Sequence, residues 1–228
     1  MAIGSPAGTY VIQDELRLSA GQLRLEGAGS DPDAPNTTIT TANPCTGDLS
    51  CRCDDATLTS QHRLVNAIAV EREPLEIARS AALSLSLEGR DLIFAGGAKG
   101  VPLGESNNGT SWHAGGGIVI ENGPLVMERV LIRDNRSRGV GAGLAVFDSD
   151  EVRIADSVIR DNFNTQAVVG FPPCSPSDTS GGATGLGGGV FLRSVRSAEI
   201  VRSAIIGNMG SRWRGHQRAR GRRAHDTQ

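Results

Sequence analysis

The sequence predicts an all-β fold, a right-handed parallel β-helix in which three short strands per coil wind into a single-stranded solenoid. Three observations favour this fold class. Glycine accounts for 30 of the 228 residues while aromatic residues make up only 4%, a balance that suits stacked aliphatic side chains and tight turns. Apolar residues alternate with a period of two, which is typical of strands. Similar segments also recur along the chain, as expected of a repeat protein.

The recurring segments begin with a glycine cluster and end with an asparagine. Three clear copies span residues 115–135, 141–162 and 187–208, and a less regular copy spans residues 85–97. Near the start of the chain, the same alternation places leucines at 16, 18, 23 and 25. Because stacked coils bury what a single repeat cannot, we interpret these copies as successive coils of one solenoid.

Alternate positions within the copies form columns that stay apolar or small, so we expect them to point inward. The clearest columns are Leu125, Val152 and Ala198; Met127, Ile154 and Ile200; Val130, Ser157 and Ser203; and Ile132, Ile159 and Ile205. One outward column is also apolar, which predicts either an exposed patch or, more simply, a surface covered by a loop. Its members are Ile93, Leu131, Val158 and Ala204.

The asparagines that end the copies are interpreted as structural. Asn135, Asn162 and Asn208 fall at one place in the coil, where stacked amides can hydrogen-bond along the ladder and satisfy turn backbone groups. A binding or catalytic role is the alternative. The glycine clusters predict turns that need positive φ or close packing. None of the clusters has the strand-to-helix context of a phosphate-binding loop.

Insertions interrupt the coils, and loops that emerge at one phase of a solenoid often form its binding face. We predict a β-helix over residues 1–208 with insertions at about 30–58, 98–114 and 163–186. Exposed aromatic rings beside amides suit sugar stacking, although the same rings could instead anchor their loops on the wall. The candidate ligand-binding residues are Trp112, His113, Asn107, Asn108 and Phe171, with Phe163 as a further aromatic of the third insertion.

The four cysteines and the C-terminal residues form two further features. Two alternatives stay open for the four cysteines: a disulfide in an oxidising compartment, or free thiols. Their spacing matches no structural zinc pattern. These residues are Cys45, Cys51, Cys53 and Cys174. Residues 209–228 hold six arginines and one aspartate, so we expect a basic, disordered tail. No apolar stretch is long enough to span a bilayer, and no export signal is visible. We therefore expect this chain to be part of a longer protein.

The repeats resemble bacterial right-handed β-helix proteins of the pectin-lyase-like class. More narrowly, they are similar to polymorphic outer-membrane-type repeats, in which a GG-(A/G)-I motif and an I-x-x-N motif recur. The glycine clusters at 115, 141 and 187 and the segments 132–135, 159–162 and 205–208 carry this resemblance. It covers roughly residues 7–208 and specifies fold better than function, because this fold hosts many activities.

This resemblance implies a non-enzymatic secreted or cell-surface protein that serves adhesion, carbohydrate contact or scaffolding. The alternative is a polysaccharide lyase or glycoside hydrolase, although the N-T-D, G-H-G and R-I-K motifs of the hydrolases are absent. The catalytic candidates for this alternative are Arg133, Asp134, Arg160 and Asp161. We predict no cofactor, with calcium held by Asp134 and Asp161 as the alternative.

The expected partner is a polysaccharide or a cell-surface glycan. The body of the chain, residues 1–208, carries a net charge of -7, because the whole chain carries -2 and the tail +5. This acidic balance gives no reason to expect a nucleic-acid partner. The location implied by the resemblance is extracellular or at the cell surface.

Overall fold

The fold is an all-β solenoid in which every strand pair is parallel. The computed structural model describes residues 2–12, 16–18, 21–41, 64–68, 85–99, 114–137, 140–164 and 187–210. These residues form twenty strands and no helix. Accordingly, the described part of the chain has no helix of the length and hydropathy needed to cross a lipid bilayer.

Three long sheets make up the wall of the solenoid. Sheet A contains, in order, β1 (Ala2–Gly4), β4 (Gly21–Glu26), β7 (Leu85–Arg90), β11 (Leu125–Glu128), β15 (Glu151–Ala155) and β19 (Ser197–Val201). Sheet B contains β2 (Gly8–Ile12), β5 (Thr37–Thr41), β8 (Ile93–Ala95), β12 (Leu131–Arg133), β16 (Val158–Arg160) and β20 (Ala204–Ile206). Sheet C contains β3 (Leu16–Leu18), β6 (Val65–Ile68), β10 (Ile118–Glu121), β14 (Leu144–Phe147) and β18 (Val190–Arg193).

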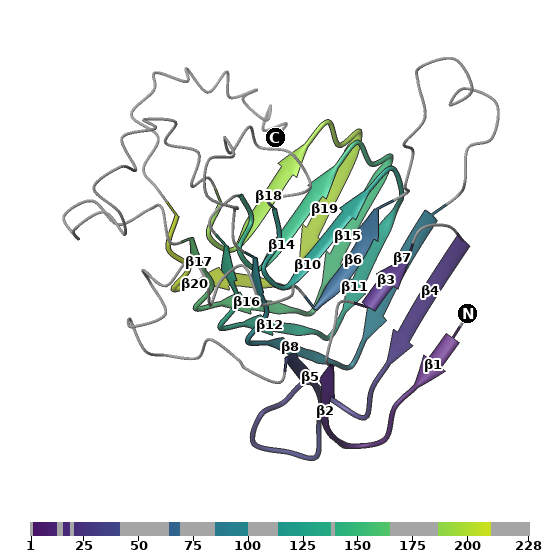
Figure 1. The fold of residues 1–228 in the computed structure, drawn as a ribbon, viewed down its shortest axis with the longest axis vertical. Helices are drawn as coiled ribbons and strands as arrows, with labels where there is room; N and C mark the ends of the chain where they lie inside the picture. The colour runs from purple at the N-terminus through teal and green to yellow at the C-terminus, as the bar shows by residue number, and fades with distance from the viewer. Residues whose placement is uncertain are drawn as a thin grey trace, which may run out of the picture.

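Consecutive strands belong to different sheets, and each strand pairs with its equivalent one coil away. Figure 1 shows this order as a gradual change of colour across each sheet, from purple through teal to yellow. The rest of each coil provides the long crossover that a parallel pair requires. The predicted parallel β-helix is therefore confirmed.

The coils also contain a short fourth strand that the sequence did not predict. Sheet D joins β9 (Ala98–Lys99), β13 (Arg136–Ser137) and β17 (Phe163–Asn164). A strand of two residues is too short to show an alternating pattern, which explains why it was missed. β9 and β17 lie at the start of the insertions expected at 98–114 and 163–186, so the coil continues slightly further than predicted before these two insertions.

The predicted inward columns fill the interior. The register pairs Ile132 with Phe94 in one direction and with Ile159 in the other, and Ile159 with Ile205. Phe94, Ile132 and Ile159 have no exposed surface, whereas Ile205 in the last described strand is 44% exposed. The columns therefore form one continuous hydrophobic core that ends where the stack of described coils ends.

The outward apolar column is buried in its first two members. Ile93 and Leu131 are 1% and 4% exposed, and they form a small cluster separate from the main core. The outer face of sheet C has a second such cluster around Val119 and Phe147, which are fully buried. The wall of the solenoid is thus apolar on both faces at these places.

Corners between the sheets adopt a repeated left-handed conformation. Asp91, Arg129, Asp156 and Arg202 occupy the corner between sheets A and B in successive coils, with φ between 47° and 54°. At the corner before sheet C the residue is a glycine, and Gly115, Gly141 and Gly187 have φ of 59–63°. The predicted need for positive φ at the glycine clusters is confirmed. Because each corner repeats, polar side chains at one corner are stacked along the solenoid.

Candidate functional site

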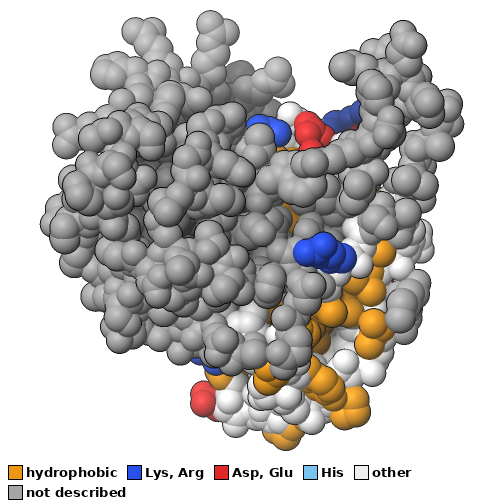
Figure 2. All heavy atoms as spheres, viewed as in Figure 1, with side chains coloured by type: hydrophobic (Ala, Val, Ile, Leu, Met, Phe, Trp, Pro, Cys, Tyr) orange, Lys and Arg blue, Asp and Glu red, His pale blue; other side chains and the backbone are white. Residues whose placement is uncertain are grey.

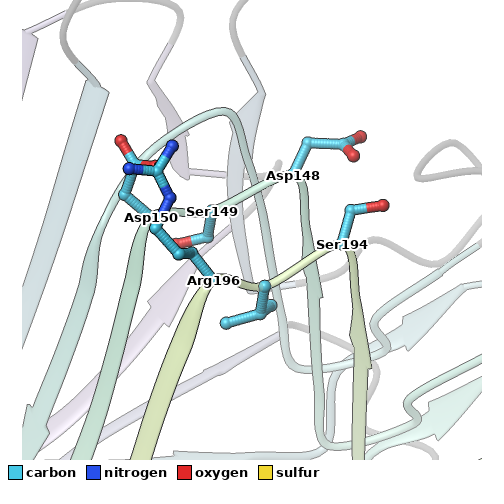
Figure 3. Close-up of a pocket in the computed structure, with 6 residues that line it drawn as sticks. Asp148, Ser149, Asp150, Ser194 and Arg196 are labelled. Atoms are coloured by element: carbon cyan, nitrogen blue, oxygen red, sulfur yellow. The ribbon is translucent and has the colours of Figure 1, made fainter.

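A shallow polar pocket lies at the corner between sheets C and A. Its lining comes from two stacked corners, Asp148 to Asp150 after β14 and Ser194 to Arg196 after β18. Figure 3 shows Asp148 and Ser194 on neighbouring corners with side chains directed to the same side, while Asp150 and Arg196 lie together at the other end. The pocket therefore presents two carboxylates, a hydroxyl and a guanidinium on adjacent coils.

The backbone of these corners is fixed by hydrogen bonds. Asp148 and Ser194 adopt left-handed φ angles of 50° and 55°. The Ser149 hydroxyl donates to the Gly123 carbonyl at 2.7 Å, which ties this corner to the preceding coil. The backbone N–H of Arg196 donates to the Ser149 carbonyl at 2.9 Å. The Asp148 corner is therefore hydrogen-bonded to the coils on both sides, and the Ser194 corner to the coil before it. These bonds fix the backbone positions from which the pocket side chains extend.

The polar groups of the pocket differ in how strongly they are engaged. Asp150 and Arg196 form an ion pair at 3.1 Å, but both side chains are more than three-quarters exposed, so this pair contributes little to stability. Neither the Asp148 carboxylate nor the Ser194 hydroxyl has a side-chain partner among the described residues. As far as the described residues are concerned, these two groups can bind a ligand without a competing bond being broken.

The sequence did not identify this pocket. Its signal was present as two polar segments at the same phase, residues 148–150 and residues 194–196, each between the first and second strands of a copy. Alternation marks inward and outward positions, but it does not show which corner side chains of neighbouring coils come together. That information depends on the register between β14 and β18.

The four catalytic candidates lie together on the outer side of sheet B. Arg133 and Arg160 are partners in register, and each donates to the aspartate that follows it. The distance from Arg133 Nη1 to Asp134 Oδ2 is 2.7 Å, and that from Arg160 Nη1 to Asp161 Oδ2 is 2.6 Å. Both carboxylates are therefore already neutralised by their own neighbours. This arrangement fits a surface ion network, which was the alternative to chemistry at these residues.

The same four residues make a poor calcium site. Calcium takes six to eight oxygen ligands, whereas only Asp134 and Asp161 supply carboxylates here and both face arginines. The next residue along this corner is Gly207, so the column of acids ends there. Within the described ranges, no group of three His, Cys, Asp or Glu side chains is arranged to hold a metal ion.

A ladder of arginines and aspartates runs along the corner between sheets A and B. Arg129 binds Asp91 with two hydrogen bonds of 2.7 and 2.8 Å, and Arg202 binds Asp156 with two of 2.6 and 2.7 Å. The hydrogen bonds from Arg129 and, to a smaller extent, its charge hold the pKa of Asp91 below its usual range, although burial opposes this. Such bidentate pairs fix the positions of neighbouring coils, which points to structure rather than catalysis.

The predicted ligand-binding residues of the insertions are not placed. Trp112, His113, Asn107, Asn108 and Phe171 lie outside the described residues, and so do Cys45, Cys51, Cys53, Cys174 and residues 211–228 of the basic tail. Phe163 is described, and the expectation that its ring is exposed is wrong. It is 8% exposed, and the guanidinium of Arg136 lies 5.2 Å from the centre of its ring.

Comparisons with known proteins do not extend these observations. No protein-family model, no curated protein and no solved structure matches the chain. The class that the structure defines is therefore the parallel β-solenoid, and the function has to be argued from the described residues.

Proposed function

We propose that this chain is a non-enzymatic β-helix of a secreted or cell-surface protein that contacts carbohydrate through the corner pocket. The resemblance of its repeats to polymorphic outer-membrane-type and pectin-lyase-like β-helices supports the location and the class. The observation that carries the proposal is the Asp148 carboxylate, which has no side-chain partner in the described part of the chain and lies beside Ser194 on a hydrogen-bonded corner.

The chemistry of the pocket suits a sugar better than a strongly charged ligand. Asp148 and Asp150 accept hydrogen bonds from sugar hydroxyls, Arg196 donates to ring and hydroxyl oxygens, and Ser194 does both. Carboxylates of both aspartates would repel a phosphate or sulfate group at the same place. An open pocket on a regular wall also allows a chain of sugar units to continue along the surface.

The rest of the wall supports a binding role over an enzymatic one. Hydrolysis needs two carboxyl groups that flank the scissile bond, one of them protonated. Asp134 and Asp161 are instead each bound to an arginine. The paired charges along the wall stabilise a rigid surface, which is what an adhesive or scaffolding protein requires.

Binding to a glycan array tests the proposal. We expect the protein to bind neutral or amino-sugar glycans, and Asp148→Ala to weaken that binding about tenfold, the effect of losing one hydrogen bond to a charged acceptor. The matched control is Asp161→Ala, which removes a corner carboxylate outside the pocket and should leave binding unchanged. Equal losses in both variants, or no glycan binding by the unmodified protein, would count against the proposal.

An assay for lyase activity separates the alternative function. Incubation with a panel of uronate polysaccharides in calcium should release no unsaturated sugar that absorbs in the near ultraviolet. Release of such products, and its loss in Arg133→Ala or Arg160→Ala, would replace the binding proposal with an enzymatic one.

A further inference from the structure

The exposed apolar side chains of the solenoid gather at its two ends. The large hydrophobic residues that are exposed among the described residues are Ile3, Tyr10, Val11, Ile200, Ile205, Ile206 and Met209. The first three lie in β1 and β2, at one end of sheets A and B, and the next three lie in β19 and β20, at the other end. Figure 2 shows hydrophobic side chains on the side where the N-terminal strands lie in Figure 1.

These end residues belong to the same columns. The column of Ile3 passes through Leu25, Gly89, Met127 and Ile154 and ends at Ile200. The column of Tyr10 passes through Ile39, Phe94, Ile132 and Ile159 and ends at Ile205. Val11 and Ile206 follow them as the next residue of the same strands. The residues exposed at one end therefore match those exposed at the other end in the same way as the residues of two neighbouring coils match each other.

We infer that the end formed by β19 and β20 binds the end formed by β1 and β2 of a second copy of this chain, head to tail. In that joint Ile200 stacks on Ile3, Ile205 on Tyr10 and Ile206 on Val11. All strands of one sheet are parallel, so the backbone groups of the outer edges of β19 and β20 match those of β1 and β2.

The edge strands of the proposed joint carry little of the usual protection against such pairing. Exposed edges are normally blunted by charged residues, proline or bulges. No charged residue occurs within β1, β2 or β20, and β19 has one, Glu199. The ladder of asparagines is open in the same direction, because Asn208 accepts from Asn162 at 2.9 Å whereas its own backbone N–H has no acceptor among the described residues.

The joint is continuous in two of the three sheets. In the chain order the strands follow as sheets A, B and C, and the described strands begin with β1 in sheet A and end with β20 in sheet B. In sheet C, one strand position between β18 of one copy and β3 of the next is therefore left unfilled by the described strands. Because the two partner surfaces are different, the contact is heterologous and can repeat, which predicts linear oligomers rather than closed dimers.

Variants with one blocked end test the inference. We expect the unmodified full chain to form oligomers whose mass rises with concentration in sedimentation velocity. Ile205→Lys blocks one end and Tyr10→Lys the other, and each variant alone should be monomeric, with at least a tenfold weaker association. Val126→Lys, which places the same charge on the wall between the ends, should assemble as the unmodified chain does. Circular dichroism shows whether each variant retains its β structure.

A mixture of the two blocked variants gives the decisive result. Each retains one intact end, so an equal mixture should form a dimer that contains one of each and grows no further. A monomeric unmodified chain at all concentrations would overturn the inference, because its ends would then be covered by its own chain. Dimers of Tyr10→Lys alone would also overturn it, because they would show contact between two like ends. Assembly of all variants alike would indicate unspecific aggregation and overturn it too.

Discussion

At the scale of single residues, the buried asparagines determine how firmly one coil is joined to the next. Asn162 is fully buried. Its Nδ2 donates to the Ile132 carbonyl at 2.9 Å, and its Oδ1 accepts from the backbone N–H and the side-chain amide of Asn135 at 3.1 and 2.9 Å. One side chain thereby makes three hydrogen bonds to buried polar groups of the preceding coil.

Substitution of Asn162 should therefore destabilise the protein more than substitution of the last asparagine. In Asn162→Ala, several buried donors and acceptors lose their partner at about 1–3 kcal/mol each, so we expect a loss of about 3 kcal/mol in the free energy of unfolding. Asn208 is partly exposed, so water replaces its bonds and Asn208→Ala should cost about 1 kcal/mol or less. Urea unfolding measures both values. Equal losses of unfolding free energy in the two variants would show that burial does not set the contribution of each asparagine to the ladder.

The sequence predicted these residues because they recur at one phase of a visible repeat. The inward columns followed from the alternation, and the register confirmed them, as with Ile132, Ile159 and Ile205. The polar pocket was not predictable in this way. Asp148 and Arg196 come from different coils, and only the pairing of those coils brings their corners together.

At the scale of the elements, the turns that lead into sheet C control how closely coils approach. A Cβ atom on Gly116 would lie 1.9 Å from the carbonyl oxygen of Arg136. Contacts of this length with backbone cannot be relieved by rotating a side chain. The glycine cluster is therefore required by the distance between the turn and the short strand β13, a strand that the sequence did not reveal.

Alanine at this turn should disrupt the coil. We expect Gly116→Ala to cost at least 3 kcal/mol in the free energy of unfolding, since the backbone has to move to accommodate the methyl group. Gly4→Ala is the matched control, because a Cβ atom there has no heavy atom within 4 Å and its φ is not positive. Thermal unfolding should leave the control within about 0.5 kcal/mol of the parent. A harmless Gly116→Ala would mean that β13 does not pack against this turn.

At the scale of the whole molecule, the solenoid is a sum of contacts between neighbouring coils. Each coil buries its inward side chains only against the coils on either side, so stability and assembly depend on the same surfaces. The fully buried Ile132 and the 44% exposed Ile205 are one column seen at its middle and at its end. The proposed head-to-tail contact repeats this internal packing between copies.

The central claim is that successive coils are stacked in parallel and in register, and a disulfide between neighbouring coils tests it most directly. Val126 on β11 and Arg153 on β15 are register partners, and adjacent strands lie about 4.8 Å apart, a spacing that a disulfide can bridge. With the four native cysteines replaced by serine, Val126→Cys combined with Arg153→Cys should form this bond on mild oxidation. Val126→Cys combined with Glu151→Cys, displaced by two residues along the same strand, should not. Bond formation in the displaced pair, or in neither pair, would contradict the stacked register.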